Sequence, residues 1–594
     1  MIKCFVKFLK LFLITTILLL TLSCNSLVGE GTSKESDIDL DKDSTQVTEN
    51  ITKSNNEESI KNLNSNKDSS TDNDSHIKSN SKDKESTDTN SKTGGVLRRL
   101  WSDPPTLDPH LSSDTTSSGI VVEIHSGLIT LNPQLEIIPD IAESWEISDD
   151  LLTYTFIIRD DAVFHDGKKI TANDFKWSFE RAANPKTASP VADTYLSDIV
   201  GVNEVIDGIR NDISGVKIID NLTLEITIDE PKPYFLAKLT YPTAYVLDKE
   251  NVLNGGSNWA DKPNGAGPFK LKEYKVGERL ILERNQNYHL GSPKLNRIVM
   301  NLAGGQSMAM YENDEIDITG VGMLDLERVL DLNNPLSTEI VVAPPSFSIT
   351  YIGFNTNVNP FDDIYFRKAL THSINKPLIA SEVLSDLVIP AYGILPPGFP
   401  GYQKDLKGLE YNLEIAREYL AKSKYSDPST RDRIVITVPG SGGNIGIDLE
   451  VILNMWSEEL GIEVEIQQVE WATYLEDLQK QKFQAFGGLG WEADYPDPQD
   501  FLDILFHTES ELNHGGYSND VIDSLIVEAR TEVDSNKRIE IYHDIEQRLV
   551  NDSPWIPLWF AGERYVLIKP YIKNYFLTPM VIPKLRYVYI DKTE

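Results

Sequence analysis

Hydrophobic and polar positions follow three different patterns along the chain. Residues 11–22 form an apolar run that ends just before Cys24. From about residue 29 to residue 93 the chain is built mainly of Ser, Asn, Asp, Lys, Thr and Glu, with hardly any large apolar side chain. Beyond Gly95, short β-rich runs alternate with amphipathic segments, so we expect the folded body to begin there.

The first half of the folded body contains several β-rich runs and one clear helix. Runs typical of strands lie at residues 154–159, 224–228 and 280–284. The segment at residues 173–183 predicts a helix, and Thr171 and Asp174 have the spacing of a capping box that would begin it.

The second half alternates strands and helices more regularly. Strands are expected at residues 434–438, 462–469 and near 483–489, and helices at residues 447–460, 473–481 and after Asn519 and Asn536. Gly461 is a suitable C-terminal stop for the helix before it. Because strands joined through helices usually lie parallel, we expect a mostly parallel sheet covered by helices in this half.

The N-terminus has the arrangement of an export signal. Three lysines precede the apolar run, which is too short for a spanning helix of about 20 apolar residues. We therefore expect residues 1–23 to be a signal peptide. Residues 20–24 resemble a bacterial lipobox, which makes Cys24 the expected lipid anchor, with an ordinary signal peptide as the alternative. Residues 24–95 would then be a disordered tether, because so few apolar residues cannot offset the entropy lost on ordering.

Composition and charge exclude several classes of protein. At 594 residues the chain is too long for one core, since single cores stop growing at about 250–300 residues. A net charge of −35 would repel nucleic acid and anionic membrane surfaces, so neither is an expected partner. Both cysteines, Cys4 and Cys24, precede the folded body, which therefore has no disulfide and no Cys-ligated metal. The nine histidines lack the close spacing of a metal site, so no metal or cofactor is expected.

Catalytic motifs are also missing. Residues 439–443 look superficially like a nucleophile elbow, but Pro439 stands where the elbow needs a glycine. No phosphate-binding loop of the G-x-x-x-x-G-K type occurs, and nothing marks a catalytic pair among the many carboxylates. A binding protein is therefore favoured over an enzyme.

Six segments together resemble the oligopeptide-binding family, the peptide and nickel class of bacterial ABC-importer binding proteins. They occur in the family order at residues 103–110, 123–128, 152–175, 265–288, 351–374 and 490–498. The resemblance implies an α/β fold of two lobes joined by two chain crossings, with mixed sheets flanked by helices and an extra domain inserted in the first lobe. The implied boundaries are 96–131, 266–347 and 554–594 for lobe I, 132–265 for the inserted domain and 348–553 for lobe II.

The resemblance also implies a function. The protein would be an extracytoplasmic lipoprotein, a monomer held at the outer face of the cell membrane, within a cell wall or a periplasm. It would capture short peptides between its lobes and deliver them to the permease of an ABC importer. In the family, the aspartate of the Gly-Trp-x-Ala-Asp motif holds the ligand's α-ammonium, and this residue is Asp494 here. A nickel chelate or another small solute, a surface signalling or interaction role, and a peptidase are the alternatives.

Other residues of the expected site follow from the same resemblance. Gly490, Trp491 and Glu492 match the strand that pairs with the ligand, although a tryptophan is also a common core residue. Asp103 opens the opposite pairing segment, in which the next two residues are prolines and offer carbonyls alone. Members that prefer very short peptides carry an arginine where this chain has Gly488, so no clamp for the ligand's carboxylate is evident at that position.

Overall fold

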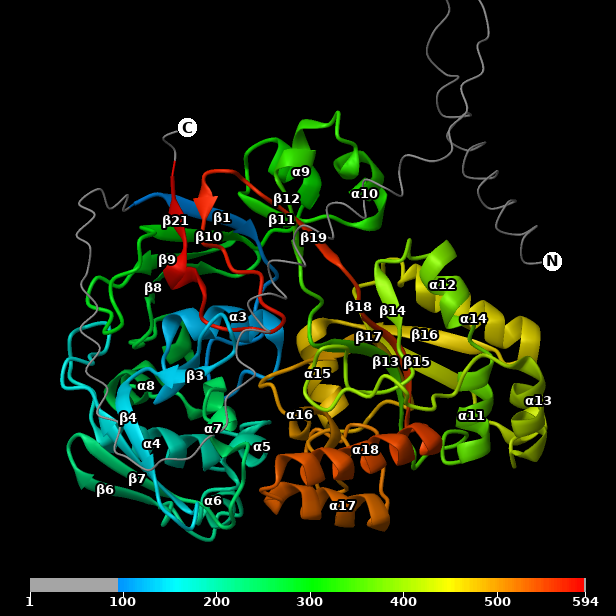
Figure 1. The fold of residues 1–594 in the computed structure, drawn as a ribbon, viewed down its shortest axis with the longest axis horizontal. Coiled ribbons are helices and arrows are strands. Elements are labelled where there is room, and N and C mark those ends of the chain that lie inside the picture. The colour runs from blue at the N-terminus through cyan, green and yellow to red at the C-terminus, as the bar shows by residue number, and fades with distance from the viewer. Residues whose placement is uncertain (1–93, 592–594) are drawn as a thin grey trace, which may run out of the picture. The chain divides into compact units, whose positions relative to one another are not determined.

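The computed structural model of this protein describes residues 94–591, and the fold is built around three main sheets (Figure 1). Cys24 and the predicted signal peptide lie outside the described residues, as does nearly all of the predicted tether. No helix within residues 94–591 has the length and apolar character needed to cross a bilayer.

A seven-stranded mixed sheet contains the first and nearly the last strands of the body. In spatial order it consists of β12 (Ile340–Ala343), β19 (Arg564–Ile568), β11 (Ile318–Gly320), β1 (Val96–Leu100), β10 (Arg297–Asn301), β9 (Arg279–Arg284) and β8 (Phe269–Lys275). β1 runs parallel to both of its neighbours, whereas the other pairs are antiparallel. Helix α3 (Thr115–Ile124) packs on this sheet, with Ile120 and Ile124 in a shared core with Phe269 and Leu282.

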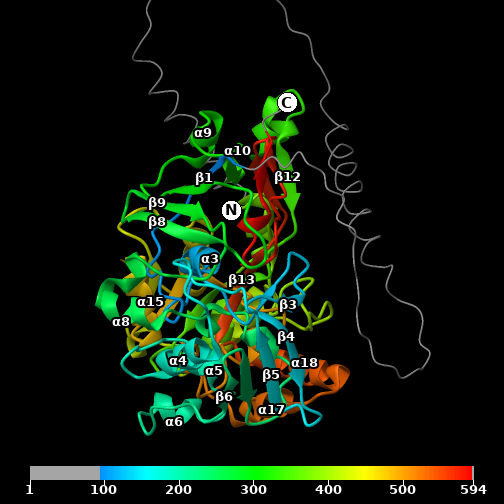
Figure 2. The same cartoon turned by 90° about the vertical axis from the view of Figure 1, so that its left-hand side faces the viewer.

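A four-stranded antiparallel sheet lies in the segment predicted to be the inserted domain. Its order is β4 (Ala142–Ile147), β5 (Thr153–Ile158), β7 (Thr223–Thr227) and β6 (Val216–Asp220). Every second residue of β5 and β7 is buried, so one face of these strands forms a core with α4 (Ala172–Ala183). Figure 2 shows the ribbons of α4, β4, β5 and β6 in this part of the molecule. The predicted capping box is confirmed, since the Asp174 carboxylate accepts a hydrogen bond from the Thr171 N–H at 2.9 Å.

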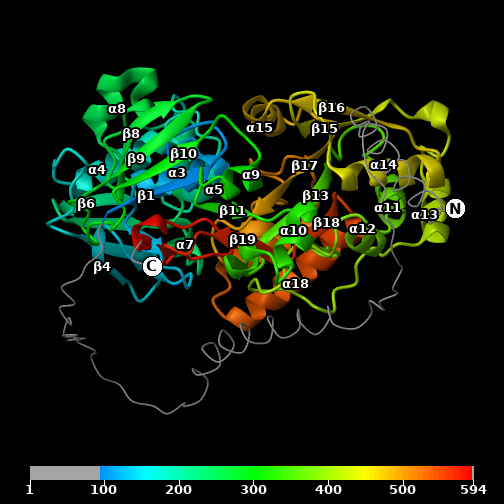
Figure 3. The ribbon, with the colours of Figure 1, turned by 90° about the horizontal axis from the view of Figure 1, so that it is seen from above.

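A six-stranded sheet forms the second lobe. Its order is β14 (Val388–Pro390), β18 (Trp555–Ala561), β13 (Ser348–Phe354), β17 (Ala485–Glu492), β15 (Ile434–Pro439) and β16 (Val464–Val469). Figure 3 shows β13, β17 and β18 running side by side. Its helices are α11 (Ile364–His372), α12 (Lys376–Glu382), α13 (Leu413–Lys422), α14 (Ile447–Leu460), α15 (Trp471–Gln479), α16 (Gln499–Leu502), α17 (Asp520–Thr531) and α18 (Ser535–Asp552).

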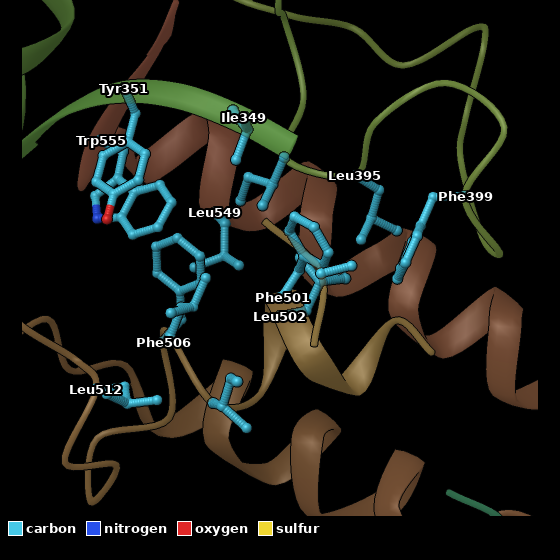
Figure 4. Close-up of a cluster of buried hydrophobic side chains, with 14 of the residues drawn as sticks. Ile349, Tyr351, Leu395, Phe399, Phe501, Leu502, Phe506, Leu512, Leu549 and Trp555 are labelled. Carbon is cyan, nitrogen blue, oxygen red and sulfur yellow. The ribbon is translucent and has the colours of Figure 1, made fainter. Parts of the chain in front are cut away.

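The core of this lobe is rich in aromatic side chains. The rings of Tyr351 and Trp555 stack with centroids 3.5 Å apart, which holds β13 and β18 together (Figure 4). Ile349 of β13 points toward Phe501 of α16 in the same cluster (Figure 4). Aromatic pairs of this kind contribute about 0.5–1.5 kcal/mol each beyond the area that they bury. The end of β17, which carries the predicted site, therefore rests on a rigid support.

The expectation of a mostly parallel sheet in this half is wrong. β15 is parallel to β16 and β17, but β13 is antiparallel to β17 and β18, and β14 is antiparallel to β18. The helices that connect neighbouring elements in sequence suggested parallel strands, whereas β13 and β18 are far apart in sequence and pair across the fold. The predicted α/β class with mixed sheets flanked by helices is confirmed.

Two short connections join the seven-stranded and six-stranded sheets. Residues 344–347 lead from β12 to β13, and residues 562–563 lead from β18 back to β19 (Figure 1). The strands on both sides are paired, with Ala343 opposite Arg564 and Ile349 opposite Phe560. The boundary expected near residue 554 thus precedes β18, which belongs to the six-stranded sheet, and the chain returns to the other sheet only after this strand.

Candidate ligand-binding site

A cavity lies where the end of β17 meets residues 132–265, which we call the inserted segment, and the C-terminal tail that follows β19. Its empty volume is about 380 Å³, part of which is open to solvent. The lining residues come from distant parts of the chain: Ser118, Val122, Thr130, Leu131, Thr240, Tyr241, Pro242, Tyr245, Ala493, Asp494 and residues 581–583. Most of these side chains are apolar, and Asp494 is the acidic group among them. The room in it for a water-sized molecule is about 20 Å³, so in this structure the cavity is narrow, and a cationic ligand group could reach Asp494 only as the surrounding elements move apart.

Asp494 connects two parts of the fold. It lies just beyond β17, and its backbone N–H donates a hydrogen bond to Oδ2 of Asp500 at 2.9 Å. Its own carboxylate accepts a short hydrogen bond from the hydroxyl of Tyr195, which lies in α5 (Ala192–Leu196) of the inserted segment. The Tyr195 ring stacks on Tyr241, with ring centroids 3.8 Å apart. The Tyr241 hydroxyl donates in turn to the carbonyl of Ser112 at 3.1 Å.

Burial makes the charged form of Asp494 costly. The pKa of its carboxyl is raised to about 7, mainly by loss of hydration and to a smaller extent by the Glu492 charge, while the Tyr195 hydrogen bond acts in the opposite direction. The pKa of the fully buried Asp500 is also raised well above its usual value, by burial first and by Asp494 second. A cation brought next to Asp494 would restore the charged carboxylate and gain a strong charge-assisted contact.

The predicted pairing strand has one free edge where the site requires it. β17 pairs with β13 along its length, but β15 pairs with it only at Ala485 and Phe486. From Leu489 to Glu492 no strand among the described residues covers the second edge. The Ala493 N–H donates to the Phe347 carbonyl at 2.8 Å, and antiparallel ladders alternate. The N–H and carbonyl groups of residues 490 and 492 therefore point away from β13.

Gly490 and Trp491 have different local roles. A Cβ at Gly490 would lie 2.5 Å from the Ile349 carbonyl oxygen, so a side chain cannot be placed there without moving β13. Trp491 is partly buried against the aromatic core of this lobe. Burial raises the pKa of Glu492, whereas the positive charges of Arg564 and Lys584 lower it. Residues 490–492 closely precede Asp494 in the chain, but none of them is among the residues that line the cavity.

Asp103 is not brought to the cavity by its side chain. Its carboxylate accepts hydrogen bonds from the Tyr274 hydroxyl at 2.8 Å and from the Gly277 N–H. Asp103 therefore holds the β8–β9 hairpin, and it is not one of the residues that line the cavity. The segment that it begins can still contribute the carbonyls of Pro104 and Pro105 to a ligand.

Tyr195, Tyr241 and residues 581–583 were not predicted as part of the site. Tyr195 lies 299 positions before Asp494 in the sequence, and no motif marks it. Only the folded arrangement brings the inserted segment, the C-terminal tail and β17 to one cavity. Within residues 94–591 no group of three His, Cys, Asp or Glu side chains is arranged to hold a metal ion.

Comparisons with known proteins agree with this architecture. Residues 136–513 match the family described as bacterial extracellular solute-binding proteins, family 5 Middle. The periplasmic oligopeptide-binding protein OppA of Escherichia coli is 30% identical over 496 residues, which cover 81% of this chain and 89% of that protein.

Two solved structures have similar folds, and each match covers nearly the whole length of the solved chain. The murein tripeptide-binding protein MppA of Escherichia coli has a TM-score of 0.75 and 27% identity, over 84% of this chain and 98% of that chain. Haemophilus influenzae OppA in complex with the peptide RPPGFSPFR has a TM-score of 0.74 and 25% identity, over 84% of this chain and 99% of that chain. These likenesses confirm the two-lobed fold. The chain belongs to the bacterial extracellular solute-binding proteins of family 5.

Proposed function

We propose that this protein is the substrate-binding component of a bacterial ABC importer, which captures short peptides at Asp494 and delivers them to the permease. The observation that carries the proposal is a free strand edge that ends at a carboxylate in a cavity. The names of the relatives support it, since OppA and MppA are oligopeptide-binding and murein tripeptide-binding proteins.

The chemistry of a peptide matches these two features. An extended peptide can add to a strand edge through main-chain hydrogen bonds, which do not depend on its side chains. Residues 490–492 would supply such bonds from one side and the carbonyls of residues 103–105 from the other. Asp494 would bind the α-ammonium, and a hydrogen bond to a charged group contributes about 1.5–3 kcal/mol.

Tyr195 gives the site a partner for Asp494 before the ligand arrives. In the structure its hydroxyl already binds the carboxylate, so the partly buried acid is not left without a partner. A carboxylate has two oxygens and several acceptor positions, so the ligand's ammonium can bind while Tyr195 remains in place. Trp491 would form a wall beside the peptide backbone.

The location of the protein is part of the proposal. Cys24 would carry the lipid anchor that holds the protein at the outer face of the cell membrane, and residues 24–95 would link it to the folded body. Metabolic labelling with a radioactive fatty acid should mark the wild-type protein and leave Cys24→Ser unmarked. Equal labelling of both proteins would contradict the anchor but not peptide binding.

Mass spectrometry of the ligands that co-purify with the protein tests the central proposal. We expect mixed short peptides with free amino termini from the wild-type protein and none from Asp494→Ala. Purified protein incubated with such peptides should release them intact, which a peptidase would not do. Release of only a nickel chelate or another non-peptide solute would contradict the proposal.

A further inference from the structure

Three cationic side chains, those of Lys584, Arg564 and Arg99, lie close enough to Tyr575 for their charges to act on it, and none of them lines the cavity that contains Asp494. The Lys584 Nζ lies 5.4 Å from the centroid of the Tyr575 ring and donates a hydrogen bond to Thr578 Oγ1 at 3.2 Å. The Arg564 Nη2 donates to the Thr578 carbonyl at 2.9 Å, so both cations meet at one residue. Arg99 completes the group, since its charge acts on both Tyr575 and Lys584. We call these three side chains the cation cluster.

The cluster has a surplus of positive charge. Burial would raise the pKa of Tyr575, but the charges of Arg99, Lys584 and Arg564 outweigh it and the pKa is lowered. The pKa of Lys584 is itself lowered, by burial first and by the two arginines among its neighbours. None of the three cations forms a direct ion pair with a carboxylate among residues 94–591. In a chain with a net charge of −35, such a group without a direct counter-ion is unexpected.

Two carboxyl groups face the cluster without neutralising it. Glu123 uses Oε1 to accept from the backbone N–H groups of Lys584 and Leu585 at 3.0 and 2.9 Å, and burial raises its pKa to about 7. Glu492 is close enough for Arg564 and Lys584 to lower its pKa, which burial raises. Two partly neutralised acids against three cations leave a positive site.

Hydrogen bonds place the cluster next to β17, the strand that is predicted to pair with the ligand. The Phe347 N–H donates to the Pro579 carbonyl at 2.8 Å, and the Ala493 N–H donates to the Phe347 carbonyl at 2.8 Å. Residues 581–583, directly before Lys584, line the cavity that contains Asp494. The charges of Arg564 and Lys584 act on Glu492. Glu492 precedes Asp494 by two positions, which span about 7 Å in an extended chain. A short peptide held at Asp494 can therefore reach the cluster.

We propose that Arg99, Arg564 and Lys584 form an anion subsite that binds a carboxylate of the ligand. The inference rests on the proposed function and extends it, because the site would then hold a peptide by opposite charges at two points. Gly488 has a φ of +69°, a backbone conformation in which an arginine would be strained, so a cation that binds the ligand's carboxylate is disfavoured at this position. The cluster provides cations for that carboxylate at another position. Guanidinium groups suit this role, since they bind carboxylates through two hydrogen bonds.

Calorimetric titration with matched tripeptides tests the anion subsite. Trialanine with a free carboxylate is compared with trialanine amide, and amidated tripeptides with one glutamate at position two or three test a side-chain carboxylate. We expect wild-type protein to bind at least one carboxylate-bearing peptide ten times or more tighter than trialanine amide. Which peptide gains shows whether the carboxylate is terminal or comes from a side chain.

Variants assign the effect to the cluster. Lys584→Gln and Arg99→Gln, singly and together, should reduce the preference to less than threefold and leave the affinity for trialanine amide unchanged. Lys584→Arg should retain the preference, because the charge is kept. Arg279→Gln, an exposed cation in the β8–β9 hairpin, is the matched control and should behave as wild type.

The possible results separate this inference from the proposed function. A preference that persists in the double variant, or a wild-type protein that binds amides and acids equally, overturns the anion subsite while peptide binding stands. If no peptide binds with or without a carboxylate, the proposed function fails, and the subsite fails with it. Thermal unfolding of each variant shows whether the fold is intact.

Discussion

Replacing Asp494 by asparagine removes a charge from the candidate site while keeping the shape of the side chain. The amide oxygen can still accept the hydrogen bond from Tyr195, so the contact between the inserted segment and the end of β17 should survive. What is lost is the carboxylate that would face the ligand's ammonium. The substitution therefore separates ligand recognition from the integrity of the fold.

The size of the effect follows from the type of contact. A hydrogen bond to a charged group contributes about 1.5–3 kcal/mol, and tenfold in affinity corresponds to about 1.4 kcal/mol. Asp494→Asn should thus weaken binding of a free-amine peptide by about 10- to 100-fold. Alanine removes the partner of both Tyr195 and the ammonium, and truncation of a buried charge pair costs about 2–5 kcal/mol, so its effect should be larger.

The pH dependence gives the prediction a direction. Burial raises the pKa of Asp494 to about 7, so the carboxyl of the ligand-free protein becomes neutral as the pH falls below that value. An ammonium binds the charged form, so ligand binding must first release the proton. The affinity of the wild-type protein for the peptide should therefore decrease as the pH is lowered from 8 to 5.5. The affinity of Asp494→Asn should change little over this range.

Calorimetric titration at both pH values measures these effects. A tripeptide with a free amino terminus is compared with its N-acetylated form, and Asp544→Asn, an exposed carboxylate of α18, is the matched control. The reasoning is refuted if wild-type protein binds the acetylated and free peptides equally. A loss of affinity in Asp494→Asn that is the same for both peptides would point to a structural role instead.

Three further substitutions test other parts of the structure. Tyr195→Phe removes a hydroxyl that lowers the pKa of Asp494, so peptide affinity should fall about 3- to 10-fold at pH 7 and by less at pH 9, measured by titration. Asp103→Ala removes the acceptor of the exposed Gly277 N–H and of the Tyr274 hydroxyl, so the free energy of unfolding should drop by about 0.5–1.5 kcal/mol while peptide affinity changes little. A large loss of affinity would place Asp103 in the site. Burial lowers the pKa of Lys376 to about 7, so the free energy of unfolding of the wild-type protein should rise with pH between about 7 and 10. In denaturant titrations, the free energy of unfolding of Lys376→Met should exceed that of the wild type by about 3 kcal/mol at pH 6 and by progressively less toward pH 10.

Local elements were predicted well from the sequence because their signals are local. The helix at residues 447–460 and its stop at Gly461 agree with the structure, as does the capping box at Thr171. Strands β5, β7 and β9 lie within a residue or two of the expected runs. Each of these depends on side chains that are neighbours along the chain.

Pairing and site geometry could not be predicted in the same way. The antiparallel partners of β13 depend on which segments meet across the fold, and neither hydrophobic period nor turn residues encode this. Tyr195 reaches Asp494 across about half of the chain, and the cation cluster joins residues from β1, β19 and the C-terminal tail. The motif identified Asp494, but the groups that surround it come from the fold.

The two connections between the sheets begin and end at paired strands, with Ala343 opposite Arg564 and Ile349 opposite Phe560, so they run close together. Both cross at one place, which favours rotation of the lobes about a single axis over sliding of one lobe along the other. Arg564 begins β19 at the end of one connection, and its Nε donates to the carbonyl of Pro344 in the other connection at 3.0 Å. We expect this bond to persist as the lobes turn, which would keep Arg564 at the pivot. Binding of a ligand carboxylate to this guanidinium would then be coupled directly to the rotation that closes the two lobes.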